Sequence, residues 1–287
     1  MFAENKSIVA LSLLIFFIKW LLIFFFNLET ENITNIIFNI DDRQYFTLIH
    51  NLANLNFNPT YDFNLINSNF IPLPLYSIIF HSLFFKLFNI YGFVLIEFFI
   101  ILVFFYILVG FFKKIGLDKN EAIFLALFFF CLPNLIEYFH LDEIEYVSAI
   151  KHLYYMRVPR PLISSLYLFL FFYLLINRNS QTGFSKITLA FIGITLSLMF
   201  SSYYYNLAIC GITLLFHYFY VVGFSKKKIT KYFHDGFVII LFFIIISIPI
   251  IYILFNSEPD YLTRVGLVEL NFEKKKILLF HFVNKIL

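Results

Sequence analysis

The stretch Ile40-Asp41-Asp42-Arg43-Gln44-Tyr45-Phe46-Thr47-Leu48-Ile49-His50 places two adjacent carboxylates shortly after the first long apolar segment of the chain. It belongs to the first polar segment that is long enough to form a site. Tyr45, Leu48 and Ile49 fall at helical spacing, which predicts an amphipathic helix. Asp41 can cap this helix, with Gln44 as its capping-box partner. We therefore expect the acidic pair to stand at the start of a helix.

The composition of the chain points to a lipid environment. Its 287 residues are 61% hydrophobic and 14% charged, whereas a soluble domain is nearer half apolar and a quarter charged. One soluble core could not bury this excess, so lipid is the expected solvent for much of the chain. Cys131 and Cys210 both lie in apolar segments, so no disulfide framework is expected. No basic tract is interleaved with aromatic residues, so no nucleic-acid partner is expected.

Long apolar segments recur along the whole chain and predict membrane-spanning helices. They cover residues 8–26, 91–112, 121–138, 161–176, 187–200, 203–223 and 237–255, and an eighth begins before Leu287. The fold expected is therefore an all-α polytopic transmembrane protein with seven to eight spans in a single domain over residues 1–287. The end inside an apolar run suggests that a C-terminal part is missing. The first segment has no small-residue cleavage site, so we expect an uncleaved span.

Residues 27–90 are predicted to form the first outer loop, which carries interfacial helices. Its second half, residues 75–88, follows Pro72 and Pro74, and its polar residues recur about once per turn. We interpret this stretch as a helix that lies at the membrane interface and does not cross it. The short loops with Lys113 and Lys114 and the basic loop 226–236 then lie inside, which makes the N-terminus cytoplasmic.

Two charged residues, Lys19 and Glu97, fall within predicted spans. A lone buried charge is costly, so we predict that they pair. The alternative is that Lys19 extends toward the outer surface while Glu97 faces a wet cavity.

The pattern Asp41-Asp42-Arg43-Gln44-Tyr45, followed by Ile49-His50-Asn51-Leu52, resembles the first-loop signature of GT-C membrane glycosyltransferases of the protein mannosyltransferase and aminoarabinose transferase type. The later segments Ile71-Pro72-Leu73-Pro74-Leu75-Tyr76 and Leu83-Phe84-Phe85-Lys86-Leu87-Phe88-Asn89 resemble the family's "PPL … lFG" region. Here Leu73 separates the two prolines and Asn89 replaces the glycine. The likeness covers most of the chain as topology, but its motifs are confined to about residues 40 to 90.

This resemblance implies transfer of a sugar from a polyprenyl-phosphate donor to a lipid, glycan or protein acceptor on the outer face of the bilayer. Such an inverting displacement needs a carboxylate base for the acceptor hydroxyl and positive charge, or a divalent metal ion, at the leaving phosphate. By position, Asp41 matches the family's catalytic Asp and the residue that would hold a metal, and Asp42 its acidic neighbour. An N-cap role for Asp41 is the alternative.

Arg157 and Arg160 are the candidates for binding the donor phosphate, because a guanidinium offers planar, bidentate donors. Arg264 is a further candidate, and anchoring to lipid headgroups is the alternative for all three. The outer-side histidines, which we expect to be solvated at the interface, are His50, His81, His140 and His152. The rival function is a non-catalytic membrane protein, either a lipid or glycan transporter or a degenerate GT-C scaffold. A transporter would place polar residues near mid-membrane on broken helices.

Overall fold

The structure is a computed structural model, and it describes residues 2–26, 43–56, 75–143, 162–177, 184–202, 204–224 and 229–256. The regular structure in these ranges is entirely helical and includes no strand, which confirms the all-α class for the described residues. The helices are α1 (Phe2–Phe26), α3 (Arg43–Ala53), α4 (Leu75–Phe88), α5 (Tyr91–Lys114), α6 (Lys119–Tyr138), η1 (Leu141–Glu143), α8 (Leu162–Ile176), α9 (Lys186–Ser202), α10 (Tyr204–Phe224) and α11 (Ile229–Asn256).

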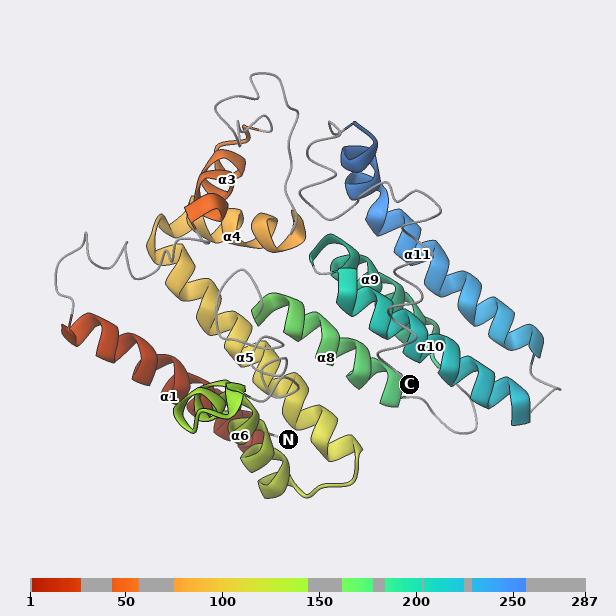
Figure 1. The fold of residues 1–287 in the computed structure, drawn as a ribbon, viewed down its shortest axis with the longest axis horizontal. Coiled ribbons are helices and arrows are strands. Elements are labelled where there is room, and N and C mark those ends of the chain that lie inside the picture. The colour runs from red at the N-terminus through yellow and green to blue at the C-terminus, as the bar shows by residue number, and fades with distance from the viewer. Residues whose placement is uncertain are drawn as a thin grey trace.

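Most of the long helices run side by side, while α4 lies crosswise at one end of α5 (Figure 1). Helix α5 packs against α1, α6 and α8, and α8 packs against α9, which in turn contacts α10 and α11. The short helix α3 sits on α4, and α4 also reaches α9. The chain thus forms a row of packed helices with α3 and α4 covering one end.

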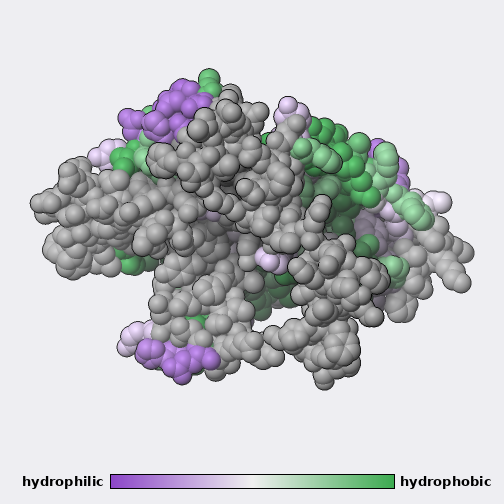
Figure 2. Space-filling view, turned by 45° about the horizontal axis from the view of Figure 1, so that its top comes forward, coloured by the Kyte–Doolittle hydropathy of each residue, from purple (hydrophilic) through white to green (hydrophobic). Residues whose placement is uncertain are grey.

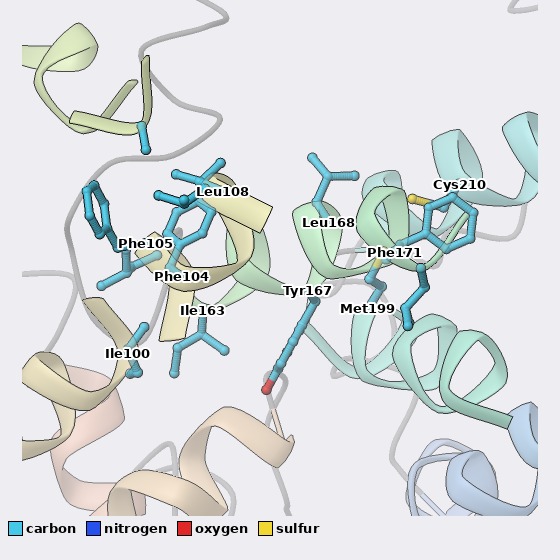
Figure 3. Packing of buried hydrophobic residues seen from close by; sticks show 14 of the residues in the cluster. Ile100, Phe104, Phe105, Leu108, Ile163, Tyr167, Leu168, Phe171, Met199 and Cys210 are labelled. Atoms are coloured by element: carbon cyan, nitrogen blue, oxygen red, sulfur yellow. The ribbon is translucent and has the colours of Figure 1, made fainter. Parts of the chain in front are cut away.

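The apolar core lies where α5, α8 and α9 meet (Figure 3). Phe104, Phe105 and Leu108 of α5 are fully buried there, together with Phe171 of α8 and Met199 of α9. These helices are apolar on every side, so hydrophobicity alone does not decide which of their side chains are buried. The side chains that pack against a neighbouring helix are the buried ones.

A second, smaller cluster joins α3 to α4 and α5. Its buried members are Leu48 and Ile49 of α3, Ile78 of α4 and Phe93 of α5. The turn between α4 and α5 is tight, because Asn89 takes a positive φ of 51° and a Cβ on Gly92 would overlap the backbone carbonyl of Phe84. Asn is the residue that best tolerates this left-handed conformation after Gly.

Helices α9 and α11 approach each other closely at Gly193. A Cβ at this position would overlap the backbone carbonyl oxygen of Ile239. Along the same interface, the hydroxyls of Ser197 and Ser247 form a hydrogen bond of 2.8 Å. Small residues and hydroxyl pairs of this kind are typical of helix contacts in membranes.

Two expectations about helix boundaries can be compared with the structure. The segments 187–200 and 203–223 do form two successive helices, but the boundary lies slightly later than the predicted join at residues 201–202, since α9 ends at Ser202 and α10 begins at Tyr204. The predicted basic loop 226–236 is wrong over its second part, because α11 begins at Ile229. Asp235 within it is buried.

Two helices in the described part of the chain are long and apolar enough to cross a bilayer, namely residues 91–114 and 232–253. Four further apolar helices there are shorter, at residues 6–18, 75–88, 162–176 and 186–202. The expected seven to eight spans are therefore not confirmed. The described part of the chain is all-helical and has two candidate membrane spans.

Large apolar side chains cover the outer sides of α10 and α11. Exposed examples are Phe216 and Phe219 of α10 and Ile244, Ile248 and Tyr252 of α11. Figure 2 shows apolar residues gathered on the side where Figure 1 places α11. Continuous apolar surface of this kind is rare on soluble monomers and is typical of a surface that meets lipid or a partner.

Candidate functional site

The residues predicted to carry the chemistry all lie outside the described part of the chain. These are Asp41 and Asp42 for catalysis and Arg157, Arg160 and Arg264 for the donor phosphate. The structure neither brings them together nor separates them. It does place the start of α3 at Arg43, directly after the acidic pair, as the helical spacing in this segment predicts.

Three polar residues of α4 face the interior of the protein, whereas Lys86 of the same predicted stripe is exposed. Ser77, His81 and Ser82 are buried, whereas Phe80 and Leu83 of the same helix are exposed. The expectation that His81 is solvated is therefore wrong, because its side chain is only 1% exposed and its ring contacts that of Phe93 at 5.9 Å. The helix turns its polar face to the bundle because α3, α5 and α9 pack against it.

The other outer-side histidines differ from His81. His50 and His140 are exposed, as predicted, and His152 lies outside the described residues.

The imidazole of His81 has a defined tautomer. Its Nδ1–H donates to the carbonyl oxygen of Ser77 at 2.6 Å, and a carbonyl oxygen can only accept. Nε2 therefore carries a lone pair, and it has no hydrogen-bond partner among the described residues. Burial lowers the pKa of His81 to about 4, against the smaller opposing effect of the bond to Ser77. The ring is consequently neutral near pH 7.

Two buried hydroxyls lie near each other, one on α4 and one on α8. Tyr167 extends from α8 toward α4, and its hydroxyl points away from the apolar cluster (Figure 3). It faces Ser77, which precedes His81 by one helical turn. Both side chains are buried, at 4% and 0% exposure. The Ser77 hydroxyl is the hydrogen-bonding neighbour of the Tyr167 hydroxyl, and no other partner of either group is found among the described residues.

The hydroxyls of Ser77 and Tyr167 therefore face each other from α4 and α8, while His81 Nε2 is a buried atom without a hydrogen-bond partner among the described residues. Leaving such a group unsatisfied costs roughly 1–3 kcal/mol. Neighbouring Ser82 escapes this cost, since its hydroxyl donates to the carbonyl of Ile78 at 2.7 Å.

Glu97 is a second buried polar feature, between α1 and α5. Its side chain is 3% exposed, and its Oε2 accepts a hydrogen bond from Trp20 Nε1 at 3.1 Å. Lys19 belongs to α1, but its side chain lies outside the described part of the structure. The ion pair between Lys19 and Glu97 thus stays a prediction, and the indole of Trp20 is the contact that sequence reasoning missed.

The described residues contain no group of three His, Cys, Asp or Glu side chains that could hold a metal ion. A divalent metal remains a prediction tied to Asp41. Tyr167 was missed because it lies in an uninterrupted apolar run, and only its phenolic hydroxyl distinguishes it from its neighbours. The spacing of Ser77 and His81 was recognised, but the direction of their face was not.

Comparison with models of known protein families, with curated proteins and with solved structures found no match.

Proposed function

We propose that this protein is a membrane glycosyltransferase of GT-C type, which transfers a sugar from a polyprenyl-phosphate donor to a lipid, glycan or protein acceptor on the outer face of the membrane. The observation that best supports the proposal is the attachment of α3. This helix begins directly after Asp42 and is held to α4 and α5 by Leu48 and Ile49. A catalytic carboxylate needs such a fixed support, because small displacements of a reacting group are costly in rate.

In this proposal Asp41 removes the proton from the acceptor hydroxyl while the bond from the sugar to the phosphate breaks. Asp42 is its acidic partner, and a divalent metal would bind at Asp41. Arg157, Arg160 and Arg264 would neutralise the leaving phosphate. The exposed apolar sides of α10 and α11 support a bilayer as the setting, where a polyprenyl carrier resides.

The interfacial placement of α4 belongs to the same proposal. Its crosswise position at the end of α5 supports it (Figure 1), and so does its packing beneath α3. Polar groups inside a membrane protein mark substrate paths and reaction sites more often than simple packing. The inward-facing polar residues of α4 therefore favour a site at this end of the bundle.

The decisive variant is Asp41→Asn, because Asn caps a helix as well as Asp does but cannot act as a base. In a strain that lacks this protein, we expect one sugar to be missing from the lipids, glycans or proteins of the envelope by mass spectrometry. The wild-type chain should restore it, and Asp41→Asn should reduce transfer by roughly 10²- to 10⁴-fold.

Asp118→Asn is the matched control. Asp118 caps α6, where it accepts a hydrogen bond from the Glu121 backbone at 2.8 Å, so the same carboxylate-to-amide change occurs at a helix start with no proposed role. It should restore the sugar fully. Normal transfer by Asp41→Asn would end the catalytic assignment, and unaltered glycans in the deletion strain would favour a non-catalytic membrane protein.

A further inference from the structure

Helix α11 carries a proline inside its length, at Pro249. Proline has no N–H to donate to the carbonyl of Ile245, four residues earlier, and its ring crowds the preceding turn, so a helix bends at such a position. In Figure 1 the dark-blue end of α11 departs from the line of the rest of the helix. The residues beyond Pro249 are therefore joined to the rest of α11 by one backbone hydrogen bond fewer than in a regular helix.

The turn before this proline is held from two neighbouring helices. The phenolic hydroxyl of Tyr76 on α4 donates a hydrogen bond to the backbone carbonyl of Ile246. The next residue, Ser247, forms the buried 2.8 Å hydrogen bond with Ser197 of α9. Lipid offers no partner to backbone groups, so a proline inside a membrane helix depends on side chains of this kind from its neighbours. Tyr76 therefore supports α11 at the point where the helix supports itself least.

The position of Tyr76 also connects α11 to the short helix α3. Tyr76 lies in the first turn of α4, close to Ile78, which is buried against α3. The opposite end of α4 is fixed to α5 by the tight turn at Asn89 and Gly92. The tyrosine bond can therefore break and leave that turn intact, which frees α11 without detaching α4 from the bundle.

We infer that Pro249 is a hinge in α11 and that the Tyr76 hydroxyl is the latch that closes it. While the bond to Ile246 is formed, the last turns of α11 and the helices α3 and α4 move as one unit. When the bond is lost, the residues beyond Pro249 swing about the hinge, and those before it stay packed on α9. This movement opens the edge of the bundle where α4 meets α11. Its use as an entry for a lipid-linked substrate rests on the proposed function, whereas the hinge and the latch do not.

Distances between pairs of spin labels test the latch in the full chain, reconstituted in lipid nanodiscs. The exposed Cys131 is first replaced by Ser, and the buried Cys210 remains. One label is attached at Leu87→Cys on α4. The other is attached on α11, either at Phe255→Cys beyond the proline or at Ile244→Cys before it, and all three positions are exposed. Double electron–electron resonance then gives one distance distribution that crosses the hinge and one that does not.

The variant Tyr76→Phe removes the latch hydroxyl and keeps the ring. It should raise the open population in the distance that crosses the hinge roughly two- to tenfold, the weight of one hydrogen bond, and leave the other distance unchanged. Tyr106→Phe is the matched control, because Tyr106 is exposed on α5, and it should change neither distance. Pro249→Ala restores the backbone donor and removes the hinge, so Tyr76→Phe should have no further effect when it is added to Pro249→Ala.

Three results would overturn the inference. Tyr76→Phe could change neither distance, it could change both equally, as a general loosening of α4 would, or its effect could persist in full after Pro249→Ala. Asp41→Asn should keep the wild-type distances, since it touches neither the hinge nor the latch. A protein that shows the latch but transfers no sugar would therefore count against the proposed function alone.

Discussion

His81 links the stability of this fold to pH, because burial keeps its imidazole neutral. The folded protein holds the pKa of His81 near 4, while the unfolded chain has the ordinary value of about 6.5. Between these two values the unfolded state binds a proton that the folded state does not. Stability therefore falls as the pH drops from about 6.5 to about 4, and this group adds no further loss below that.

We expect this group to cost on the order of 3 kcal/mol of unfolding free energy at the acidic end of that range. Thermal unfolding in detergent, followed by circular dichroism at a series of pH values, would measure it. The difference between wild type and His81→Gln isolates the contribution, and His50→Gln is the control because His50 is exposed. A wild-type curve parallel to that of His81→Gln would refute the assignment.

The residues of α4 also mark the limit of inference from the sequence. Helical spacing grouped Ser77, His81, Ser82 and Lys86 in one stripe, and the structure buries the first three but leaves Lys86 exposed. Polar residues recur with the same helical period whether their face meets water or the interior of a protein surrounded by lipid. The sequence therefore could not show which way this face of α4 turns, and only the packing of the neighbouring helices decides it. The catalytic role of Asp41 and Asp42 stays a prediction, although the start of α3 at Arg43 agrees with the predicted helix.

At the scale of the elements, the contact between α9 and α11 depends on the absence of a side chain at Gly193. A methyl group there would overlap the backbone of Ile239, and a backbone cannot rotate away as a side chain can. Gly193→Ala should lower stability by roughly 1–3 kcal/mol, as overpacking does. Thermal unfolding of the purified protein in detergent would measure the loss.

Gly211→Ala supplies the comparison for that variant, because a Cβ on Gly211 of α10 would meet no atom within 4 Å among the described residues. The same substitution should there be neutral or stabilise by up to about 1 kcal/mol through helix propensity. Equal effects at the two positions would mean that α9 and α11 do not meet as described. No sequence pattern distinguishes these glycines, since each lies inside an apolar helix and only the neighbouring helix differs.

At the scale of the whole molecule, the positions of the helices could be predicted from the sequence, but which of them cross the membrane could not. Long apolar runs located α5, α6, α8, α9 and α10 within a few residues, because the backbone of such runs must bond internally in lipid. Runs of 14 to 17 residues, such as α4 and α9, fit equally well across a thin region, along an interface or inside a core. Composition alone could not choose among these places.

The proposed topology is tested most simply on either side of α4 and α5. If α5 crosses the bilayer and α4 lies flat, the end of α3 is outside and the start of α6 is inside. Asn56→Cys and Asn120→Cys place the same substitution at these two exposed positions without changing charge. Cys131 is exposed and would first be replaced by Ser, whereas the buried thiol of Cys210 can remain.

A membrane-impermeant maleimide should label Asn56→Cys in intact cells and Asn120→Cys only after permeabilisation. The basic residues Lys113 and Lys114 at the end of α5 favour this direction, because positive charge in short loops stays on the cytoplasmic side. Labelling of both positions from outside would mean that α4 and α5 cross together or that neither does, and the acidic pair would lose its interfacial helix. The reverse pattern would turn Asp41 and Asp42 toward the cytoplasm, where the proposed transfer to an outer-face acceptor could not occur.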